Sequence, residues 1–171
     1  IRTPRHQYDR VRLALAGDHQ VENALVAVRL LEAAQAKGVQ VGVEHITHAL
    51  ARVEWPGRLE RVAAGHGRAL LIDAAHNPEG AAALARYLRQ WHPERPPLIF
   101  AAMRDKDVDG MLRALLPATG TVIVTAPALA RAEPPEALAA RVRALAPGRR
   151  VREERDPALA VECALAEAPM A

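Results

Sequence analysis

An aspartate and a histidine stand directly after a short apolar run, at a place where ligands often bind. Residues 69–72 read as a buried strand, and Asp73 and His76 follow before a helix start at residue 78. In a β/α protein, ligands gather at the carboxyl ends of strands, where the next helix presents unpaired N–H groups and its positive dipole end. Asp73 could accept hydrogen bonds from ligand hydroxyls such as those of a ribose, and His76 could contact a phosphate or a carboxylate.

Each of these residues also has a simpler interpretation. Asp73 could be a solvated loop acid or a turn former, and His76 an exposed turn residue. Asn77 precedes Pro78, a pattern typical of an N-cap with proline at the first helical position, so we predict that Asn77 caps the helix.

Two further segments could contact a ligand. Arg58 follows Pro56 and Gly57, a sharp turn that could aim its guanidinium across a domain boundary, and arginine suits bidentate phosphate binding. Because arginines are scattered along the chain, a plain surface charge is the alternative. Residues 104–107 follow an apolar run at 98–102 and form either a second ligand contact or a polar loop.

The sequence lacks the motifs of several common sites. It has neither a Gly-x-Gly-x-x-Gly segment nor a Gly-x-x-x-x-Gly-Lys-Ser/Thr phosphate loop. Its histidines lack His-Glu-x-x-His spacing, and His45 and His48 have no third ligand, which favours a surface position. Cys163 is the only cysteine, which excludes an internal disulfide and a cysteine-based zinc site, and its apolar surroundings favour a core position. We therefore predict no metal site in this chain.

The first 54 residues predict one strand and two helices. Alternating apolar residues at 11–15 indicate a strand that runs into a turn at Gly17, and Asp18 can cap the helix that follows. The apolar face of that helix consists of Val21, Ala24, Leu25, Val28 and Leu31. The second helix carries Ile46, Ala49, Leu50 and Val53 at helical spacing. Trp55-Pro56-Gly57 breaks the pattern, and we place a domain boundary there.

From residue 59 onward, strands and helices alternate. The predicted strands are 59–64, 69–72, 98–102, 121–125 and one near Val151, with a turn at 65–67 between the first two. The predicted helices are 78–90, 108–115, 134–145 and one from residue 157. This alternation predicts an α/β, Rossmann-like fold with a mostly parallel sheet and helices on both faces.

Composition limits the class of protein. The 171 residues are 50% hydrophobic with a formal net charge of +3, which is typical of a globular domain. The aromatic residues are too few and too dispersed for a surface that stacks single-stranded nucleic acid. No apolar run has the length of a membrane helix, and no signal peptide is present, so we expect a cytoplasmic protein without nucleic-acid or membrane partners. The first residue is isoleucine, which favours a fragment or a processed product.

Five short segments, taken in order, resemble those of folylpolyglutamate synthase and dihydrofolate synthase in the Mur ligase superfamily. Residues 17–24 are similar to the family's Gly-x-His-Gln-x-x-Asn-Ala segment, and residues 55–58 match its Trp-Pro-Gly-Arg turn. Residues 73–78 resemble Asp-Gly-Ala-His-Asn-Pro, with alanine at position 74 where glycine is common. Residues 105–107 and 131–132 also fall in the expected order.

The resemblance implies a domain plan and a reaction. Residues 1–54 would be the C-terminal tail of the central ATPase domain, and residues 55–171 a Rossmann-like ligase domain that lacks its last strand. The phosphate loop, the Mg²⁺ ligands and much of the folate site would lie in a missing N-terminal domain. ATP would phosphorylate a carboxylate of folate or dihydropteroate, and the amine of L-glutamate would attack the acyl phosphate. The full-length enzyme would be a monomer, and the 171 residues alone would be inactive.

The resemblance also assigns roles to four residues, with ATP bound between the two domains. Asn23 would contact the nucleotide, Arg58 would reach its phosphates, and Asp73 would accept a hydrogen bond from the ribose. His76 would be the catalytic residue, near the γ-phosphate or the incoming glutamate.

Two other functions stay open. A Mur-type peptidoglycan amino-acid ligase shares the domain plan and the acyl-phosphate chemistry, although the His-Gln and Trp-Pro-Gly-Arg details favour folate. A stand-alone, non-catalytic nucleotide-binding or ligand-binding module would keep only the C-terminal fold. A Gly-x-x-Gly-Lys-Ser/Thr stretch encoded upstream of Ile1 would support a ligase, and a start codon just before Ile1 would support the module.

Overall fold

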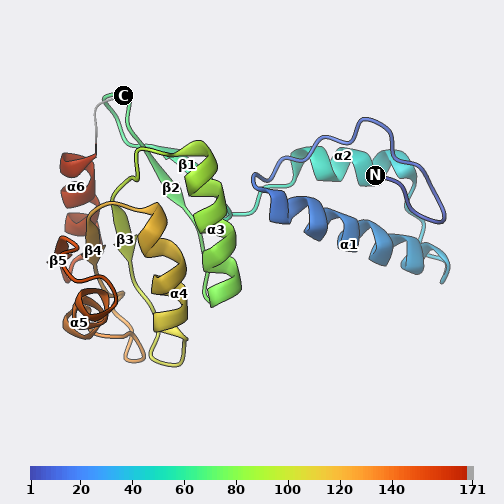
Figure 1. The fold of residues 1–171 in the computed structure, drawn as a ribbon. Coiled ribbons are helices and arrows are strands. Elements are labelled where there is room, and N and C mark those ends of the chain that lie inside the picture. The colour runs from blue at the N-terminus through green and yellow to red at the C-terminus, as the bar shows by residue number, and fades with distance from the viewer. Residues whose placement is uncertain (169–171) are drawn as a thin grey trace. The chain divides into compact units, whose positions relative to one another are not determined.

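The computed structural model describes residues 1–168, which form two compact units (Figure 1). Unit 1 comprises Ile1–Arg61 and Leu71–Asp73, and unit 2 comprises Val62–Leu70 and the chain from Ala74 onward. Among these residues, no helix combines the length and the apolar character that crossing a membrane requires.

Unit 1 is built on two helices. Helix α1 spans Asp18–Gln35, and helix α2 spans Val43–Arg52. Their shared core consists of Tyr8, Val28 and Ile46. The prediction that Asp18 caps α1 is wrong, because Gly17 occupies the N-cap and Asp18 lies in the first turn. There the charge of Asp18 still favours the positive end of the helix dipole.

The segment at 11–15 is extended but is not a strand. Its side chains alternate between half-buried and exposed, as a period of two requires. A strand also needs a ladder partner, and no strand within residues 1–168 pairs with this segment. The amide of Ala14 donates instead to the carbonyl of Leu50 at 2.9 Å. The predicted strand is therefore wrong, although the alternation behind it is real.

The packed face of α1 is narrower than predicted. Its buried residues fall at every fourth position and are Gln20, Ala24, Val28 and Glu32. Val21 and Leu25, predicted on this face, are 53% and 42% exposed, while Val26 and Leu30 are 59% and 66% exposed. Within the described part of the chain, α1 therefore leaves four large apolar side chains uncovered, two beside the buried stripe and two on the opposite side of the helix.

A two-stranded sheet follows unit 1's helices, as the sequence predicts. Strand β1 spans Glu60–Ala63, strand β2 spans Ala69–Ile72, and the two are hydrogen-bonded neighbours. Gly65 and Gly67 in the predicted turn have φ angles of 78° and 74°, a region that glycine adopts without strain.

The sheet of unit 2 is parallel. It consists of β3 (Leu98–Phe100), β4 (Val122–Val124) and β5 (Val151–Glu153), in the order β3-β4-β5. All three residues of β4 are buried, as expected for a central strand covered on both faces.

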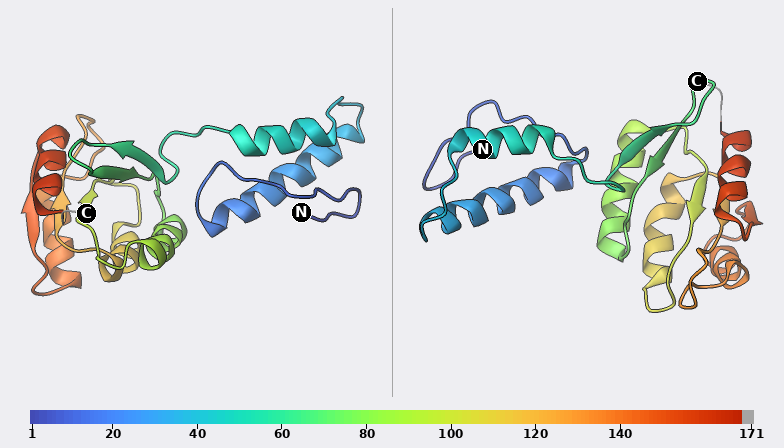
Figure 2. Two further views of the ribbon diagram at one scale, coloured as in Figure 1. Left: turned by 90° about the horizontal axis from the view of Figure 1, so that it is seen from above. Right: turned by 180° about the vertical axis from the view of Figure 1, so that it is seen from behind.

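Helices cover both faces of this sheet, which confirms the predicted α/β architecture. They are α3 (Pro78–Trp91), α4 (Val108–Leu115), α5 (Pro135–Leu145) and α6 (Pro157–Glu167), with a short 3₁₀ turn, η1, at Leu116–Ala118. Helices α3 and α4 pack side by side on one side of the sheet, and α6 packs on β3 and β4 from the other (Figures 1 and 2). Cys163 on α6 packs with the buried Ile123.

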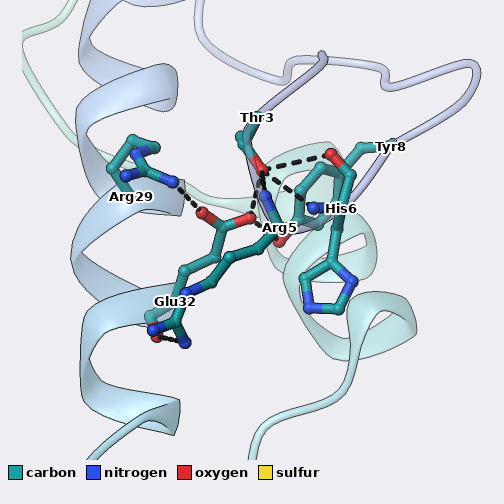
Figure 3. A network of polar contacts seen from close by, with 6 residues as sticks. All are labelled: Thr3, Arg5, His6, Tyr8, Arg29 and Glu32. Atoms are coloured by element: carbon teal, nitrogen blue, oxygen red, sulfur yellow. Dashed lines mark hydrogen bonds and ion pairs between the residues drawn. The ribbon is translucent and has the colours of Figure 1, made fainter.

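A buried carboxylate anchors the N-terminal segment to α1 (Figure 3). Glu32 is 1% exposed, and Thr3 and Tyr8 donate hydrogen bonds to its Oε1. Arg29 donates to its Oε2 at 2.6 Å, and Arg5 donates to its backbone carbonyl at 2.9 Å. A charge of this kind is tolerated in an interior only when it is fully hydrogen-bonded.

The network also controls protonation. Burial alone would raise the pKa of Glu32, but hydrogen bonds from Thr3, Tyr8 and Arg29 outweigh burial and hold the pKa below its ordinary value of 4.5. Burial, followed by the hydrogen bond to Glu32, raises the pKa of the Tyr8 hydroxyl. At neutral pH the hydroxyl is therefore a donor and the carboxylate an acceptor.

We expect Tyr8→Phe to lower the free energy of unfolding by about 1 kcal/mol at neutral pH, because it removes one hydrogen bond to Glu32. The folded-state pKa of Glu32 is lowered, so the stability from its ionised form is complete above pH 4.5 and is lost as pH falls through the folded pKa. The effect of Tyr8→Phe should shrink over that range in urea unfolding. Tyr87→Phe is the control, since Tyr87 contacts the His92 ring through its own ring. A Tyr8→Phe effect that is independent of pH would contradict this account.

Candidate functional site

Unit 1 contains a cavity of about 510 Å³ between its two helices and the segment at 11–15. Aliphatic side chains form most of its wall, and its polar lining residues are His19, Gln20, Asn23 and Arg58. Trp55, which is 61% exposed, also lines it. A largely apolar cavity with a few polar groups that fix orientation is typical of a small-molecule site.

The three polar side chains from α1 form a hydrogen-bonded row. Gln20 Nε2 lies 2.9 Å from His19 Nε2, and Asn23 Nδ2 donates to Gln20 Oε1 at 3.1 Å. An amide nitrogen is only a donor, so His19 Nε2 is the acceptor in the first bond and carries no hydrogen. The buried amide of Gln20 thus uses both its donor and its acceptor inside the site.

Gly17 makes room for this arrangement. Its φ of 95° lies in a region that side chains rarely adopt. A Cβ on residue 17 would stand 2.7 Å from Cε1 of His19 and 2.8 Å from Cδ1 of Leu59. Only glycine therefore allows the His19 ring to lie against the start of α1.

Arg58 projects from a tightly held turn. The amide of Gly57 donates to Glu60 Oε2 at 2.9 Å, and the amide of Leu59 donates to Asp73 Oδ2 at 3.0 Å. Leu59 is 6% exposed and has a φ of 49°, which is strained for a bulky residue. Two carboxylates and one buried side chain thus fix the backbone on both sides of Arg58.

His76 lies in unit 2, just before α3, and is exposed. Its Nδ1 is 3.2 Å from the carbonyl of Ala74, so Nδ1 carries a hydrogen and Nε2 is the acceptor of the neutral ring. The predicted cap is confirmed: Asn77 accepts from the amide of Gly80 at 2.8 Å, and Pro78 occupies the first turn of α3.

The side chains at 104–107 have structural partners. Asp107 caps α4 by accepting from the amide of Gly110 at 2.9 Å, and Arg104 Nε donates to the carbonyl of Ala132 at 3.1 Å. The hydrogen bond from Lys106, more than any other influence, lowers the pKa of Asp105. These contacts favour the polar-loop interpretation, because they account for each of these side chains without a ligand.

No group of three or more potential ligand side chains within residues 1–168 is placed to hold a metal ion.

The structure brings three of the four predicted site residues into unit 1. Asn23 and Arg58 line one cavity, and Asp73 is bonded to the turn that carries Arg58, whereas His76 belongs to unit 2. The functional roles of all four stay predictions. Gln20 is not among the predicted site residues, although its four-residue spacing from Ala24 places a polar side chain on the buried stripe of α1, where it needs an internal partner.

Residues 57–170 match the family model of the Mur ligase, glutamate ligase domain. A dihydrofolate synthase/folylpolyglutamate synthase of Mycobacterium tuberculosis is 40% identical over 135 residues, which make up 77% of this chain and 27% of that protein. A UDP-N-acetylmuramoyl-L-alanyl-D-glutamate--2,6-diaminopimelate ligase of Bradyrhizobium diazoefficiens is 33% identical over 161 residues, 92% of this chain and 32% of that protein.

Solved structures agree with these relatives. A folylpolyglutamate synthase of Mycobacterium tuberculosis complexed with ADP matches with a TM-score of 0.81 and 37% identity, over 93% of this chain and 35% of that chain. A folylpolyglutamate synthase of Thermotoga maritima matches with a TM-score of 0.69 and 30% identity, over 89% of this chain and 35% of that chain. The chain thus spans about a third, or less, of the length of each of these proteins.

Replacing Asp73 by alanine should lower the free energy of unfolding by about 1 to 3 kcal/mol, because the amide of the buried Leu59 loses its acceptor. Asp73→Asn is the matched control, since its side-chain oxygen can accept the same hydrogen bond. Denaturant unfolding should show a clearly smaller loss for the asparagine variant. Equal losses would mean that the charge of Asp73, and not this hydrogen bond, stabilises the turn.

Proposed function

We propose that this chain, which belongs to the Mur ligase family through a glutamate ligase domain at residues 57–170, is part of an ATP-dependent ligase that adds L-glutamate to folate or dihydropteroate. The motif resemblance to folylpolyglutamate synthase and dihydrofolate synthase is confirmed by the relatives and solved structures. The observation that carries the proposal is the grouping of Asn23, Arg58 and Asp73 in unit 1 around one cavity and one turn.

The reaction has two steps. A carboxylate oxygen of the folate or dihydropteroate substrate attacks the γ-phosphorus of ATP, which forms an acyl phosphate and releases ADP. The amine of L-glutamate then attacks the acyl carbon, an amide forms, and inorganic phosphate leaves with the acyl oxygen. Proton removal from the ammonium group of glutamate must precede or accompany the second attack.

Asn23 and Arg58 would hold the nucleotide. Both line the cavity of unit 1, where the aliphatic wall favours a planar base and the amide of Asn23 supplies donor and acceptor atoms. The guanidinium of Arg58 would pair with phosphate oxygens and stabilise the charge that develops during transfer. The restrained turn limits the conformational freedom that Arg58 loses on binding.

Asp73 would combine a structural and a binding role. It accepts the Leu59 amide through Oδ2. A carboxylate can accept about four hydrogen bonds in all, so this bond is compatible with a ribose hydroxyl donating to the same group.

His76 would act on the reacting groups from the start of α3. Its Nδ1 hydrogen faces the carbonyl of Ala74, which leaves Nε2 of the neutral ring to accept a proton or a hydrogen bond. Placed there, the ring can accept a proton from the glutamate ammonium or, when protonated, neutralise a phosphate oxygen.

We assign residues 1–54 to the tail of an ATPase domain and residues 55–171 to the ligase domain, with the phosphate loop and the Mg²⁺ ligands in the remainder of the ATPase domain. The uncovered apolar side chains on α1 support this assignment, because Val21, Leu25, Val26 and Leu30 are large apolar groups that the rest of such a domain would bury. We further propose that the complete enzyme is a cytoplasmic monomer.

Replacing Leu30 by lysine should affect stability much less in the isolated 171-residue chain than in the complete polypeptide. In the isolated 171-residue chain, where Leu30 is 66% exposed, stability should change by less than about 0.5 kcal/mol and self-association should fall. In the complete polypeptide, the same change should cost about 2 to 4 kcal/mol, because it buries a charge and loses apolar contact. Leu129→Lys, at a 53% exposed position in unit 2, is the control. Equal small effects in both contexts, measured by thermal unfolding, would contradict the domain assignment.

A second candidate is a Mur-type peptidoglycan ligase. The Bradyrhizobium relative, whose name gives a muramoyl-peptide substrate, aligns over 92% of this chain. The His-Gln and Trp-Pro-Gly-Arg segments favour the folate substrate, so this candidate ranks second.

Glutamate-dependent ADP release by the complete polypeptide tests the proposal. With ATP and either tetrahydrofolate or dihydropteroate, repeated turnover to ADP should require L-glutamate, because without it each enzyme stops at the acyl phosphate after one ADP, and the 171-residue chain alone should release none. Activity with a nucleotide-linked muramic acid and none with folates would select the second candidate. Robust turnover by the 171 residues alone would contradict a site shared with a further domain.

Two substitutions separate binding from chemistry in the same assay. His76→Ala should lower kcat by about a hundredfold or more while ATP affinity stays within a few-fold. Asn23→Ala should weaken ATP binding with a smaller effect on kcat. If His76→Ala lowers ATP affinity and kcat together, the residue has a structural role instead.

A further inference from the structure

The two hydrogen bonds in the row His19–Gln20–Asn23 point in the same direction from donor to acceptor, which we call the polarity of the row. Asn23 donates to Gln20, and Gln20 donates to His19, so every bond in the row runs from the cavity side toward the start of α1. This direction requires His19 Nε2 to accept, so this nitrogen carries no hydrogen.

The middle of the row is rigid. Gln20 is 6% exposed on the buried stripe of α1, and the His19 ring lies so close to Gly17 that a Cβ there would be 2.7 Å from its Cε1. Asn23, by contrast, is an exposed residue that lines the cavity. An exposed amide can rotate by half a turn at little cost unless a neighbour distinguishes its oxygen from its nitrogen. Gln20 supplies that distinction.

The polarity decides which atoms Asn23 presents to a ligand. With one Nδ2 hydrogen on Gln20, the amide presents Oδ1 together with its second N–H. That pair matches adenine, which offers an amino donor beside a ring-nitrogen acceptor. Guanine offers two acceptors, O6 and N7, in the corresponding positions, and its O6 would face Oδ1. With the row reversed, Asn23 would present two N–H donors, which suits guanine.

We propose that Gln20 is a positioning residue that orients the Asn23 amide and thereby makes the site select adenine over guanine nucleotides. The inference rests on the proposed nucleotide site at Asn23 and adds a residue to it. Gln20 acts through Asn23, and its effect is on the choice of base.

The test is the ratio of ATP to GTP affinity in the complete polypeptide, measured by competition of each nucleotide against a fluorescent ATP analogue. Gln20→Met removes both hydrogen bonds at similar volume and should lower the ATP preference by about fivefold or more, within the discrimination that a bidentate amide supplies. Gln20→Glu keeps an acceptor for Asn23 and should retain the preference within about twofold. Gln35→Met, the same substitution on the same helix, is the control, since Gln35 bonds the carbonyl of Val41.

The ratio separates this role from a general loss of structure, because partial unfolding lowers both affinities alike. If Gln20→Met does not fold, His19→Phe provides the same test: it removes the acceptor that orients Gln20, and the ATP preference should again fall. An unchanged ratio in the folded Gln20→Met or His19→Phe variant overturns the inference. Asn23→Ala tests the underlying site separately, because unchanged ATP affinity in this variant would overturn the proposed nucleotide contact. If Asn23→Ala weakens ATP binding but Gln20→Met leaves the ratio of ATP to GTP affinity unchanged, only the role of Gln20 is overturned.

Discussion

The hydrogen bond from the amide of Leu59 to the carboxylate of Asp73 is the constraint on which unit 1 depends. It joins the end of β2 to the turn that carries Arg58, across 14 positions of sequence. With a φ of 49°, Leu59 would relax to a more favourable conformation unless the surroundings held it. Its buried side chain and the bond between Gly57 and Glu60 supply two further restraints. The direction in which Arg58 leaves the turn is therefore set by a carboxylate that itself belongs to the predicted site.

Helix α1 also combines buried apolar side chains with hydrogen-bonded polar ones, along its single buried stripe. Ala24 and Val28 are its apolar middle, and its two ends are the buried polar residues Gln20 and Glu32. Glu32 satisfies its charge with Thr3, Tyr8 and Arg29, and so ties the N-terminal segment to the helix. Gln20 satisfies its amide with His19 and Asn23, and so holds the side chain of Asn23, which lines the cavity. A polar residue buried at either end thus costs little, because each of its atoms has a partner.

The elements that could be predicted from the sequence are those whose causes are local. Asn77 with Pro78 begins a helix through a cap and a fixed φ, and Gly65 with Gly67 allows a turn, whatever lies further away. The failures concern residues whose state depends on a distant surface. The segment at 11–15 has the period of a strand but no strand partner among the described residues, and Val21 has the spacing of a core residue but is 53% exposed. Periodicity reports which face is apolar and not what covers that face.

The same distinction applies to the site. Short motifs could select Asn23, Arg58 and Asp73 as candidates, because residue type and order are written in the sequence. The polarity of the row through Gln20 could not be read there, since it depends on which ring nitrogen of His19 carries the hydrogen and on the close approach that Gly17 permits. Both features are established when unit 1 folds, so the entropy of orienting the Asn23 amide and the Arg58 turn is lost at folding and not at binding. A site built in this way can discriminate between ligands of similar size, because an amide held in one orientation repels the wrong base as well as attracting the right one.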